Sequence, residues 1–421
     1  MIPYTLTSRT EPQGSSDADD AFSMVVEAMV TAPSQQTNGA SRELMPAEVE
    51  HFAGDGKLNA WEAFNREFIE RGWGDGFPLF APTRERVEPF LRYVSPRWQP
   101  LDVIGRPFPP GDGMATVEKI AINAAMAGCE PEHMPLLIAA IQAMLESPIG
   151  QFPLRILLSS HGAGYPLMLV NGPIVKQLGL ATGMNAWGPG KPGRVNTVIG
   201  RAMRLIIMNV AHCYPEILDL DTIGTAGKYS AVIAENEDAN PWGQPFHVDR
   251  GFHANQSVVT MFAAGDVSTF SSDASQSDAL LRALAARGAA GGGGSGAGGG
   301  GALGIPSRTE GDADRGGQLL MLGPEHARSL FAAGYSKQAL REYMVKNAPA
   351  TPLREFLATY AFIGWEAVPA AVKERIAAMD PETPIRGDPN PDHIHIAVIG
   401  GSHGVSEFIT GPASISKLVE Q

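Results

Sequence analysis

Apolar side chains recur along much of the chain at the spacing of one helical face. In the first such segment Leu58, Trp61, Phe64 and Phe68 follow this spacing, and Gly72 marks its end. The same pattern, bounded by capping residues, Gly or Pro, predicts further helices later in the chain. They cover residues 83–94, 114–128, 131–145 and 195–210, and others begin near Pro324, Lys337 and Leu353.

Short apolar runs bounded by Gly, Pro or Asn are typical of buried strands. The runs cover residues 154–159, 166–170, 229–234, 257–262 and 318–322, and the final strand covers 393–400. Helices and strands mixed in this way predict an α/β fold, with a mixed α+β fold left open. We expect a large N-terminal lobe of buried strands with flanking helices and a smaller C-terminal α/β lobe.

Composition shifts along the chain predict four parts. Residues 1–55 are polar and form a flexible arm suited to wrapping a partner subunit, and residues 56–287 form the main α/β domain. Residues 288–304 are nearly all Gly and Ala, which cannot pack a core, and form a linker or loop that is either native or engineered. Residues 305–421 form the C-terminal α/β lobe.

The charge balance limits the class of partner. With 45 acidic and 32 basic residues the formal net charge is -13, which disfavours nucleic acid and anionic membrane surfaces. We therefore expect a small-molecule substrate and a homo-oligomer. There is no signal-peptide pattern and no apolar run of membrane-spanning length, so the prediction is a cytoplasmic protein without a membrane partner.

Cys129 lies between the end of one predicted helix and the start of the next. A thiol beside a helix N-terminus can have a lowered pKa and become nucleophilic or metal-binding, although Glu130 and Glu132 oppose this. The alternative is an inert buried cysteine that lets two helices approach closely. Glu118 lies about three helical turns before Cys129 and falls on a similar face, which makes it a candidate catalytic carboxylate or part of a solvated Glu–Lys face.

Polar residues also gather around the next elements. The glycine-rich loop that begins at Asn171 and leads into the helix with Asn196 and Arg201 presents backbone amides and side chains to a ligand, or is merely structural. Lys228 and Tyr229 enter an apolar strand, which ends in Glu235 and Asn236. Acids at the end of a buried strand are typical of catalytic positions in α/β folds.

Histidines supply a candidate site for a divalent transition metal. The candidate ligands are His247 and His253 in one loop, and His393 and His395, which alternate along the last predicted strand. Ordinary loop or packing roles explain these residues equally well. His326, at a predicted helix start, is a candidate general acid or ligand. A G-x-S-x-G match around Ser402 lacks the downstream His and Asp of a hydrolase triad.

Several segments together resemble a large, poorly characterised bacterial family that is often associated with small proteins carrying the UGSC (seleno)cysteine motif. The similar segments are GWGDGFPLFAPTRERV, ATVEKIAINAAMAGCEPEHMP, VNGP, GKYSAVIAENEDANPW and GPEHARSLFAAGYSK. This chain has no UGSC motif, and its glycine-rich segment departs from the family pattern. The resemblance implies that the Glu118–Cys129 helix pair, the strand from Lys228 to Glu237 and the turn around His326 form one site.

The leading hypothesis is an enzyme that acts on a small polar metabolite by lyase-type or hydrolytic acid–base chemistry. Glu118 or Glu235 is the general base, His326 an acid or ligand, Lys228 and Asn196 hold substrate charge, and a metal assists if one binds. One alternative is a redox or covalent enzyme that uses the Cys129 thiolate. The other is a non-catalytic scaffold that binds a partner subunit.

Overall fold

The computed structural model describes residues 49–146, 154–159, 164–229, 231–273, 275–290, 318–360, 368–386, 390–411 and 413–420. Contacts between Cα atoms divide the chain into Met1–Met45 and Pro46–Gln421, and every described residue belongs to the second unit. Most of the predicted arm and residues 291–304 of the predicted linker therefore lie outside the described residues.

Helices form at every position where the apolar pattern predicts them, and also at positions where it does not. They are α2 (Lys57–Glu70), α3 (Arg84–Val94), α4 (Val117–Ala127), α5 (Met134–Leu145), α6 (Leu154–Ser159), α7 (Ile174–Leu178), α8 (Arg194–Asn209), α9 (Phe246–Asp249), α10 (Ser277–Ala290), α12 (Pro324–Ala332), α13 (Lys337–Asn347), α14 (Leu353–Tyr360) and α15 (Ala370–Ala377). Short 3₁₀ turns are η2 (Pro131–His133), η3 (Ala226–Lys228), η4 (Glu237–Ala239) and η7 (Pro391–His393).

The α4–α5 pair shows how local sequence sets these boundaries. The Thr116 side chain accepts a hydrogen bond from the Lys119 amide and caps the start of α4. Gly128, at φ 89°, ends the helix in the left-handed conformation that favours glycine. Pro131 then begins η2, which leads directly into α5, whose residues are all buried.

Within the described residues, the strands form two four-stranded mixed sheets and one two-stranded antiparallel sheet. The first sheet has the order β10 (Ser414–Leu418), β3 (Val258–Ala264), β1 (Tyr165–Asn171) and β2 (Val232–Ala234). The second has the order β4 (Val267–Ser271), β9 (Val405–Thr410), β5 (Gln318–Leu322) and β8 (Ile394–Val398), and β6 (Thr351–Pro352) pairs with β7 (Pro384–Ile385). The pairs β1–β2 and β5–β8 are parallel, and the other pairs are antiparallel.

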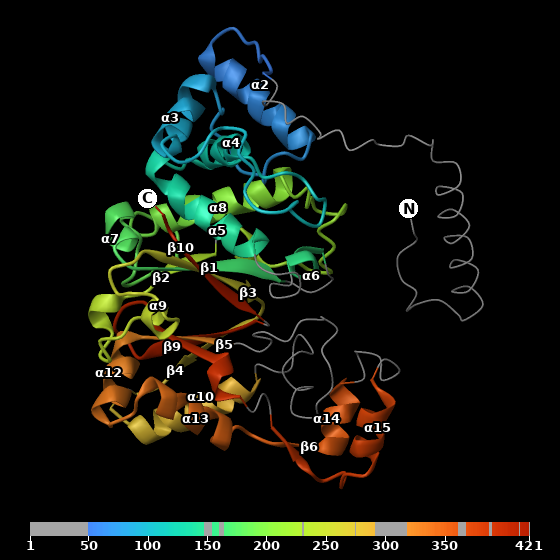
Figure 1. Ribbon diagram of the computed structural model, residues 1–421, viewed down its shortest axis with the longest axis vertical. Coiled ribbons are helices and arrows are strands. Elements are labelled where there is room, and N and C mark those ends of the chain that lie inside the picture. Colours follow the sequence, from blue (N-terminus) through green and yellow to red (C-terminus); the bar gives the residue numbers. More distant parts are fainter. Residues whose placement is uncertain are drawn as a thin grey trace, which may run out of the picture. The chain divides into compact units, whose positions relative to one another are not determined.

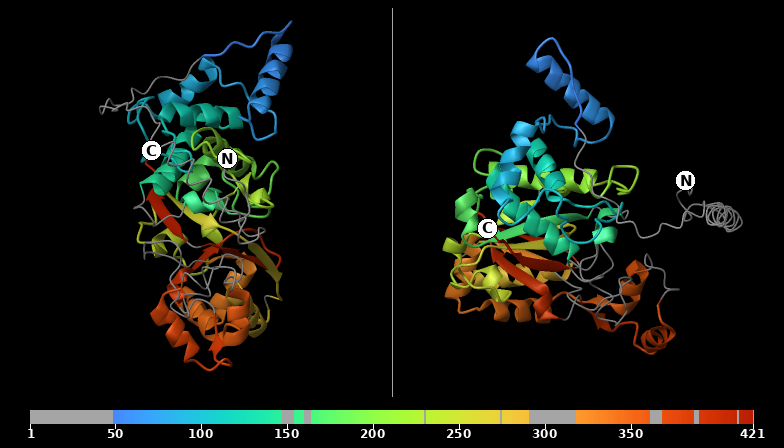
Figure 2. Two further views of the ribbon diagram at one scale, coloured as in Figure 1. Left: turned by 90° about the vertical axis from the view of Figure 1, so that its right-hand side faces the viewer. Right: turned by 45° about the horizontal axis from the view of Figure 1, so that its top comes forward.

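The two sheets pack face to face between two layers of helices (Figure 1). Because side chains alternate along a strand, Met168 and Val170 of β1 join the core beneath α4, α5 and α8, whereas Leu167 and Leu169 join the core between the sheets. The outer face of the second sheet packs on α10, α12 and α13. Figure 2 shows the same order of layers from two other directions. The predicted α/β fold is confirmed, with four layers in the order helix, sheet, sheet, helix.

Three sequence predictions about elements were wrong. Residues 154–159, a predicted strand, form helix α6, because a short apolar run without polar alternation suits either structure. The predicted final strand is β8, but β9 and β10 follow it. The strands also cross the predicted boundary at 288–304, since β4 precedes it and joins the second sheet while β10 follows it and joins the first.

No helix in the described part of the chain is both long and apolar enough to span a lipid bilayer.

Candidate functional site

The carboxyl ends of the two parallel strand pairs meet. Asn171 ends β1 and Glu235 directly follows β2, so the two residues lie side by side at one edge of the first sheet. The backbone amide of Asn236 donates to the Val398 carbonyl of β8 over 2.8 Å, and the Asn236 side chain donates to the Gly400 carbonyl over 3.2 Å. This edge therefore joins both sheets, at the position where α/β proteins usually bind ligands.

The Glu235 carboxylate is the centre of this edge and is only 1% exposed. One of its oxygens, Oε2, accepts hydrogen bonds from Asn171 Nδ2 over 2.6 Å and from the Phe246 amide over 2.7 Å. Its other oxygen, Oε1, accepts from Asn240 Nδ2 over 3.1 Å and from the Val398 amide over 3.4 Å. Four donors from four different segments thus fix the carboxylate in one orientation.

Two opposing effects set the pKa of Glu235. Burial disfavours the charged form and raises the pKa, the Lys337 ammonium and the donors of Phe246, Asn171 and Val398 lower it, and the net result is a pKa of about 7. Lys337 itself donates to Asp249 Oδ2 over 2.6 Å and to the Gln244 carbonyl over 2.7 Å. A carboxyl group with a pKa near neutrality exchanges a proton in either direction at physiological pH.

Glu237 and His247 extend the cluster around Asn171. One oxygen of Glu237, Oε1, accepts from the Gly172 amide over 2.7 Å and from Asn171 Nδ2 over 3.3 Å. His247 Nδ1 lies 3.8 Å from the same oxygen, too far for a hydrogen bond. The imidazole is fully buried, and burial lowers its pKa although the Glu237 charge raises it. Asn171, Glu235, Glu237, Asn240 and His247 are called the acid–amide cluster below.

Cys129 lies elsewhere in the molecule. Its thiol packs in the helical core beside α8 and donates to the Val198 carbonyl over 3.3 Å. Burial raises its pKa, and Glu130 adds to this effect. The predicted activation at a helix N-terminus was wrong, because desolvation outweighs the helix dipole at a site that excludes water. The structure instead shows the alternative of an inert cysteine between packed helices.

His326 is also a structural residue. It is fully buried, its Nδ1 lies 2.7 Å from Ser406 Oγ, and its Nε2 lies 3.0 Å from the Ser272 carbonyl. Because a carbonyl can only accept, Nε2 carries the proton and Nδ1 accepts from the serine. Both ring nitrogens therefore have partners within the protein, which leaves the predicted role as acid or ligand without support from the structure. The family resemblance predicted one site that contains Cys129, His326 and Glu235. Each of these residues instead has its own set of hydrogen-bond partners.

Asn196 and Arg201 on α8 hold loops in place. The Asn196 side chain accepts from the Ala181 amide over 2.9 Å and donates to the Val232 carbonyl over 3.3 Å, which closes the glycine-rich loop. Arg201 makes a buried pair with Asp75, with distances of 2.7 and 2.8 Å, and also donates to the Phe77 and Pro78 carbonyls. Both predicted substrate-binding roles are replaced by structural ones.

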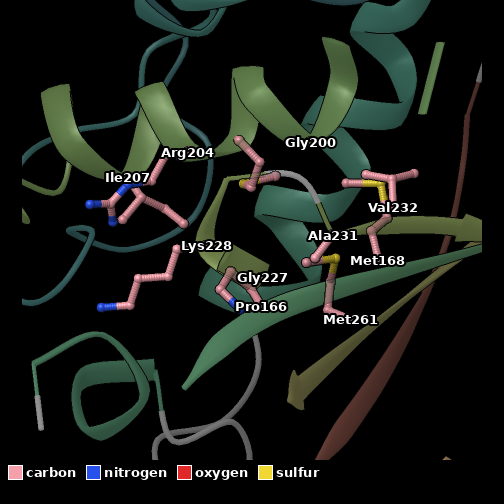
Figure 3. A pocket seen from close by; sticks show the side chains of 11 residues that line it. Pro166, Met168, Gly200, Arg204, Ile207, Gly227, Lys228, Ala231, Val232 and Met261 are labelled. Carbon is pink, nitrogen blue, oxygen red and sulfur yellow. The ribbon is translucent and has the colours of Figure 1, made fainter. Parts of the chain in front are cut away.

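Lys228 lines a small pocket beneath α8 (Figure 3). Arg204 and Lys228 lie toward one side of this pocket, and Met168 and Met261 toward the other. Both cations bind Asp219, and Lys228 also lies 2.6 Å from Asp221. The pocket's lining residues Pro166 and Met168 lie about 16 Å and about 10 Å along β1 from Asn171, at about 3.3 Å per residue.

The remaining candidates are dispersed. The ring of Tyr229 packs on Phe77, with ring centroids 4.9 Å apart, and Glu118 lies in the first turn of α4, where its amide donates to the Pro100 carbonyl. His253 is exposed, and His393 pairs with Asn390 before β8.

The predicted histidine metal site does not assemble. His395 lies between Phe246 and Phe262, and burial lowers its pKa to about 3. Within the described residues, no three His, Cys, Asp or Glu side chains are arranged to hold a metal ion. Strand alternation placed His395 in the core between the sheets, where it packs against the rings of Phe246 and Phe262.

Asn240 was not chosen from the sequence, and Glu237 was named there only as one of the acids at the end of the buried strand. Glu237 and Asn240 follow Glu235 in the run ENEDAN, directly after a buried strand. The concentration of acids and amides at this strand end was visible in the sequence. Their individual roles depend on the η4 turn, which points Asn240 back to Glu235 and Glu237 to Gly172.

No family model matches the chain, and comparison with curated proteins and with solved structures finds no match. The resemblance to the family associated with UGSC proteins therefore stays a prediction.

Proposed function

We propose that the protein is an enzyme that acts on a small polar metabolite by lyase-type or hydrolytic acid–base chemistry, with Glu235 as the group that takes up and returns the proton. One observation carries the proposal. An ionisable carboxyl group is buried where the carboxyl ends of the parallel strands of both sheets meet, and its pKa is raised to about 7.

The surrounding residues have complementary roles in this reaction. The Asn171 and Asn240 amides and the Phe246 and Val398 backbone amides orient the Glu235 carboxylate and stabilise its charged form. The apolar core between the sheets excludes bulk water, which keeps the carboxyl pKa high enough to accept a proton from a weak acid. Glu237, whose side chain is 27% exposed, marks the edge at which a substrate reaches the cluster.

The structure gives less support to the alternative functions. A thiol enzyme requires a reactive thiolate, and both cysteines are buried with raised pKa values, that of Cys213 reaching about 11. A scaffold has no need for a titrating carboxyl at a strand end. The expected small-molecule substrate rests on the acidic composition, and the homo-oligomeric state and cytoplasmic location belong to this proposal as further expectations.

The proposal is tested by activity screening in D₂O. The full-length protein is incubated with a panel of small hydroxy acids, keto acids, amino acids, amides and lactones, and proton NMR records product formation and exchange of substrate C–H protons. We expect turnover of at least one compound by the wild type and loss of about 100-fold or more in Glu235→Gln, the usual contribution of a general base. The control is Glu382→Gln, which removes an exposed carboxylate that pairs with Arg354.

Circular dichroism shows whether Glu235→Gln is folded. Turnover that survives unchanged in a folded Glu235→Gln variant contradicts the proposal, and so does a wild-type protein that is inert toward the whole panel.

A further inference from the structure

The acid–amide cluster has more hydrogen-bond acceptors than donors. Its donors already have partners: Asn171 Nδ2 and the Gly172 amide donate to carboxylates, Asn240 Nδ2 donates to Glu235 and the Gln244 carbonyl, and Lys337 donates to Asp249. Asn171 is fully buried, yet its Oδ1 meets no donor among the described residues. Buried polar atoms normally have a partner, so this oxygen needs an explanation.

His247 is the second unpartnered group. Its side chain is 0% exposed, and within the described chain neither ring nitrogen has a partner in good hydrogen-bond geometry, although the nearby backbone of His253 and Ala254 raises the pKa of the ring. Its Nδ1 is directed toward Glu237 Oε1 at 3.8 Å, a gap that a hydrogen bond does not bridge. The unpartnered histidine and the unpartnered amide oxygen thus flank the same carboxylate, because Asn171 Nδ2 also reaches Glu237 Oε1.

The acid–amide cluster has more negative than positive charge, just as it has more hydrogen-bond acceptors than donors. Glu235 and Glu237 bring two carboxyl groups, and Lys337, the cation whose charge lowers the pKa of Glu235, is paired with Asp249. Lys176 lies at the surface and pairs with Asp238. A ligand that fits this site must therefore supply hydrogen-bond donors and positive charge. A protonated amine has three N–H donors and no acceptor, which matches both requirements.

We propose that the acid–amide cluster binds a protonated amine of the substrate, held by Asn171 Oδ1, the Glu237 carboxylate and His247. This inference rests on the proposed function, and it makes the substrate an amine-bearing metabolite. Asn171, Glu237 and His247 are binding residues, and Glu235 remains the proton-transferring group.

The test uses pairs of compounds that differ in one group: L-alaninamide with L-lactamide, and ethanolamine with ethylene glycol. Binding to the full chain is followed by NMR through the backbone amide of Gly172, which donates to Glu237. We expect each amine to shift this signal at concentrations up to roughly 50 mM, since such small fragments bind weakly. We expect its hydroxyl counterpart to bind at least about ten-fold more weakly.

Two variants distinguish amine binding at the acid–amide cluster from attraction of the amine by negative charge at the surface. Glu237→Gln is expected to weaken amine binding by about ten-fold or more, because the neutral amide cannot pair with the ammonium. Asp238→Asn removes the same charge one residue away, at an exposed pair with Lys176, and is expected to leave binding unchanged. Equal effects of the two variants overturn the inference.

Three further outcomes also overturn it: equal binding of amine and hydroxyl compounds, no binding of either amine, and a response to MnCl₂ alone that EDTA reverses while the amines are silent. Failure of this inference is distinguishable from failure of the proposed function. Amine binding without turnover of any compound contradicts only the function. Glu235-dependent turnover of compounds without an amine contradicts only the inference.

Discussion

Replacing Glu235 with Gln changes how the stability of the protein depends on pH. Burial raises the pKa of this carboxyl from 4.5 to about 7 in the folded chain. Between these two values the folded chain holds a proton that the unfolded chain has released, so the contribution of Glu235 to the free energy of unfolding falls as pH rises. At about 1.36 kcal/mol per pH unit, the loss between pH 4.5 and pH 7 is about 3 kcal/mol.

The buried histidines have the opposite effect and make the variant comparison necessary. Burial lowers the pKa of His133 to about 4 and that of His395 to about 3, so their contributions to stability grow as pH rises toward 6.5. These contributions are present in both the wild type and Glu235→Gln. They cancel when the free energy of unfolding of the variant is subtracted from that of the wild type.

Urea denaturation followed by circular dichroism at a series of pH values from about 5 to about 8 measures this difference. We expect the wild type to lose about 3 kcal/mol relative to Glu235→Gln as pH rises across this range, with no further change above about pH 8. A difference that is constant with pH shows that the Glu235 carboxyl titrates alike in the folded and unfolded chains, and refutes the reasoning.

Three other predictions follow from buried contacts. Cys129 and Cys213 do not react with a thiol-specific disulfide reagent in the native protein, because both thiols are buried and donate to backbone carbonyls. Both react in denaturant, and rapid labelling of either thiol in the native protein contradicts this prediction. Gly172→Ala places a Cβ 2.0 Å from the Gln256 carbonyl oxygen, whereas Gly179 has a similar positive φ and open space around it. We expect Gly172→Ala to lower the free energy of unfolding by about 1–3 kcal/mol more than Gly179→Ala, and equal losses refute the steric argument. Arg201→Met leaves the buried Asp75 carboxylate unpaired and is expected to lower the free energy of unfolding by about 3–5 kcal/mol. The control Arg92→Met, in an exposed pair, changes the denaturation curve little, and an equally small effect of Arg201→Met means that Asp75 reaches water.

Much of the fold was predictable because local signals and packing agree. The Thr116 cap, Gly128 and Pro131 mark the ends of α4 and the start of α5 in the sequence itself. Strands β4, β9 and β10 were missed because they are short and carry many polar residues, and only their partners make them strands. For β10 this partner is β3, a fully buried strand to which it pairs from the other end of the chain.

The candidate site was predictable only in part. Glu235, Asn171 and His247 were identified as single residues, since acids after buried strands and polar residues beside glycines have local signatures. Their convergence depends on the parallel pairing of β1 with β2 and on α9, which no local pattern encodes. His326 illustrates the reverse error, because its partners Ser406 and Ser272 come from distant segments and turn a candidate acid into a structural residue.

The central claim is that a buried carboxyl group exchanges its proton near neutral pH. Carbon-13 NMR of glutamate-labelled protein, recorded for the wild type and for Glu235→Gln, measures this directly. We predict one carboxyl signal, missing in the variant, that titrates with a midpoint near the pKa of about 7 expected for Glu235. A Glu235 signal that titrates at or below the ordinary glutamate pKa of 4.5 means that the carboxylate is permanently charged at neutral pH and contradicts its role as the proton-transferring group.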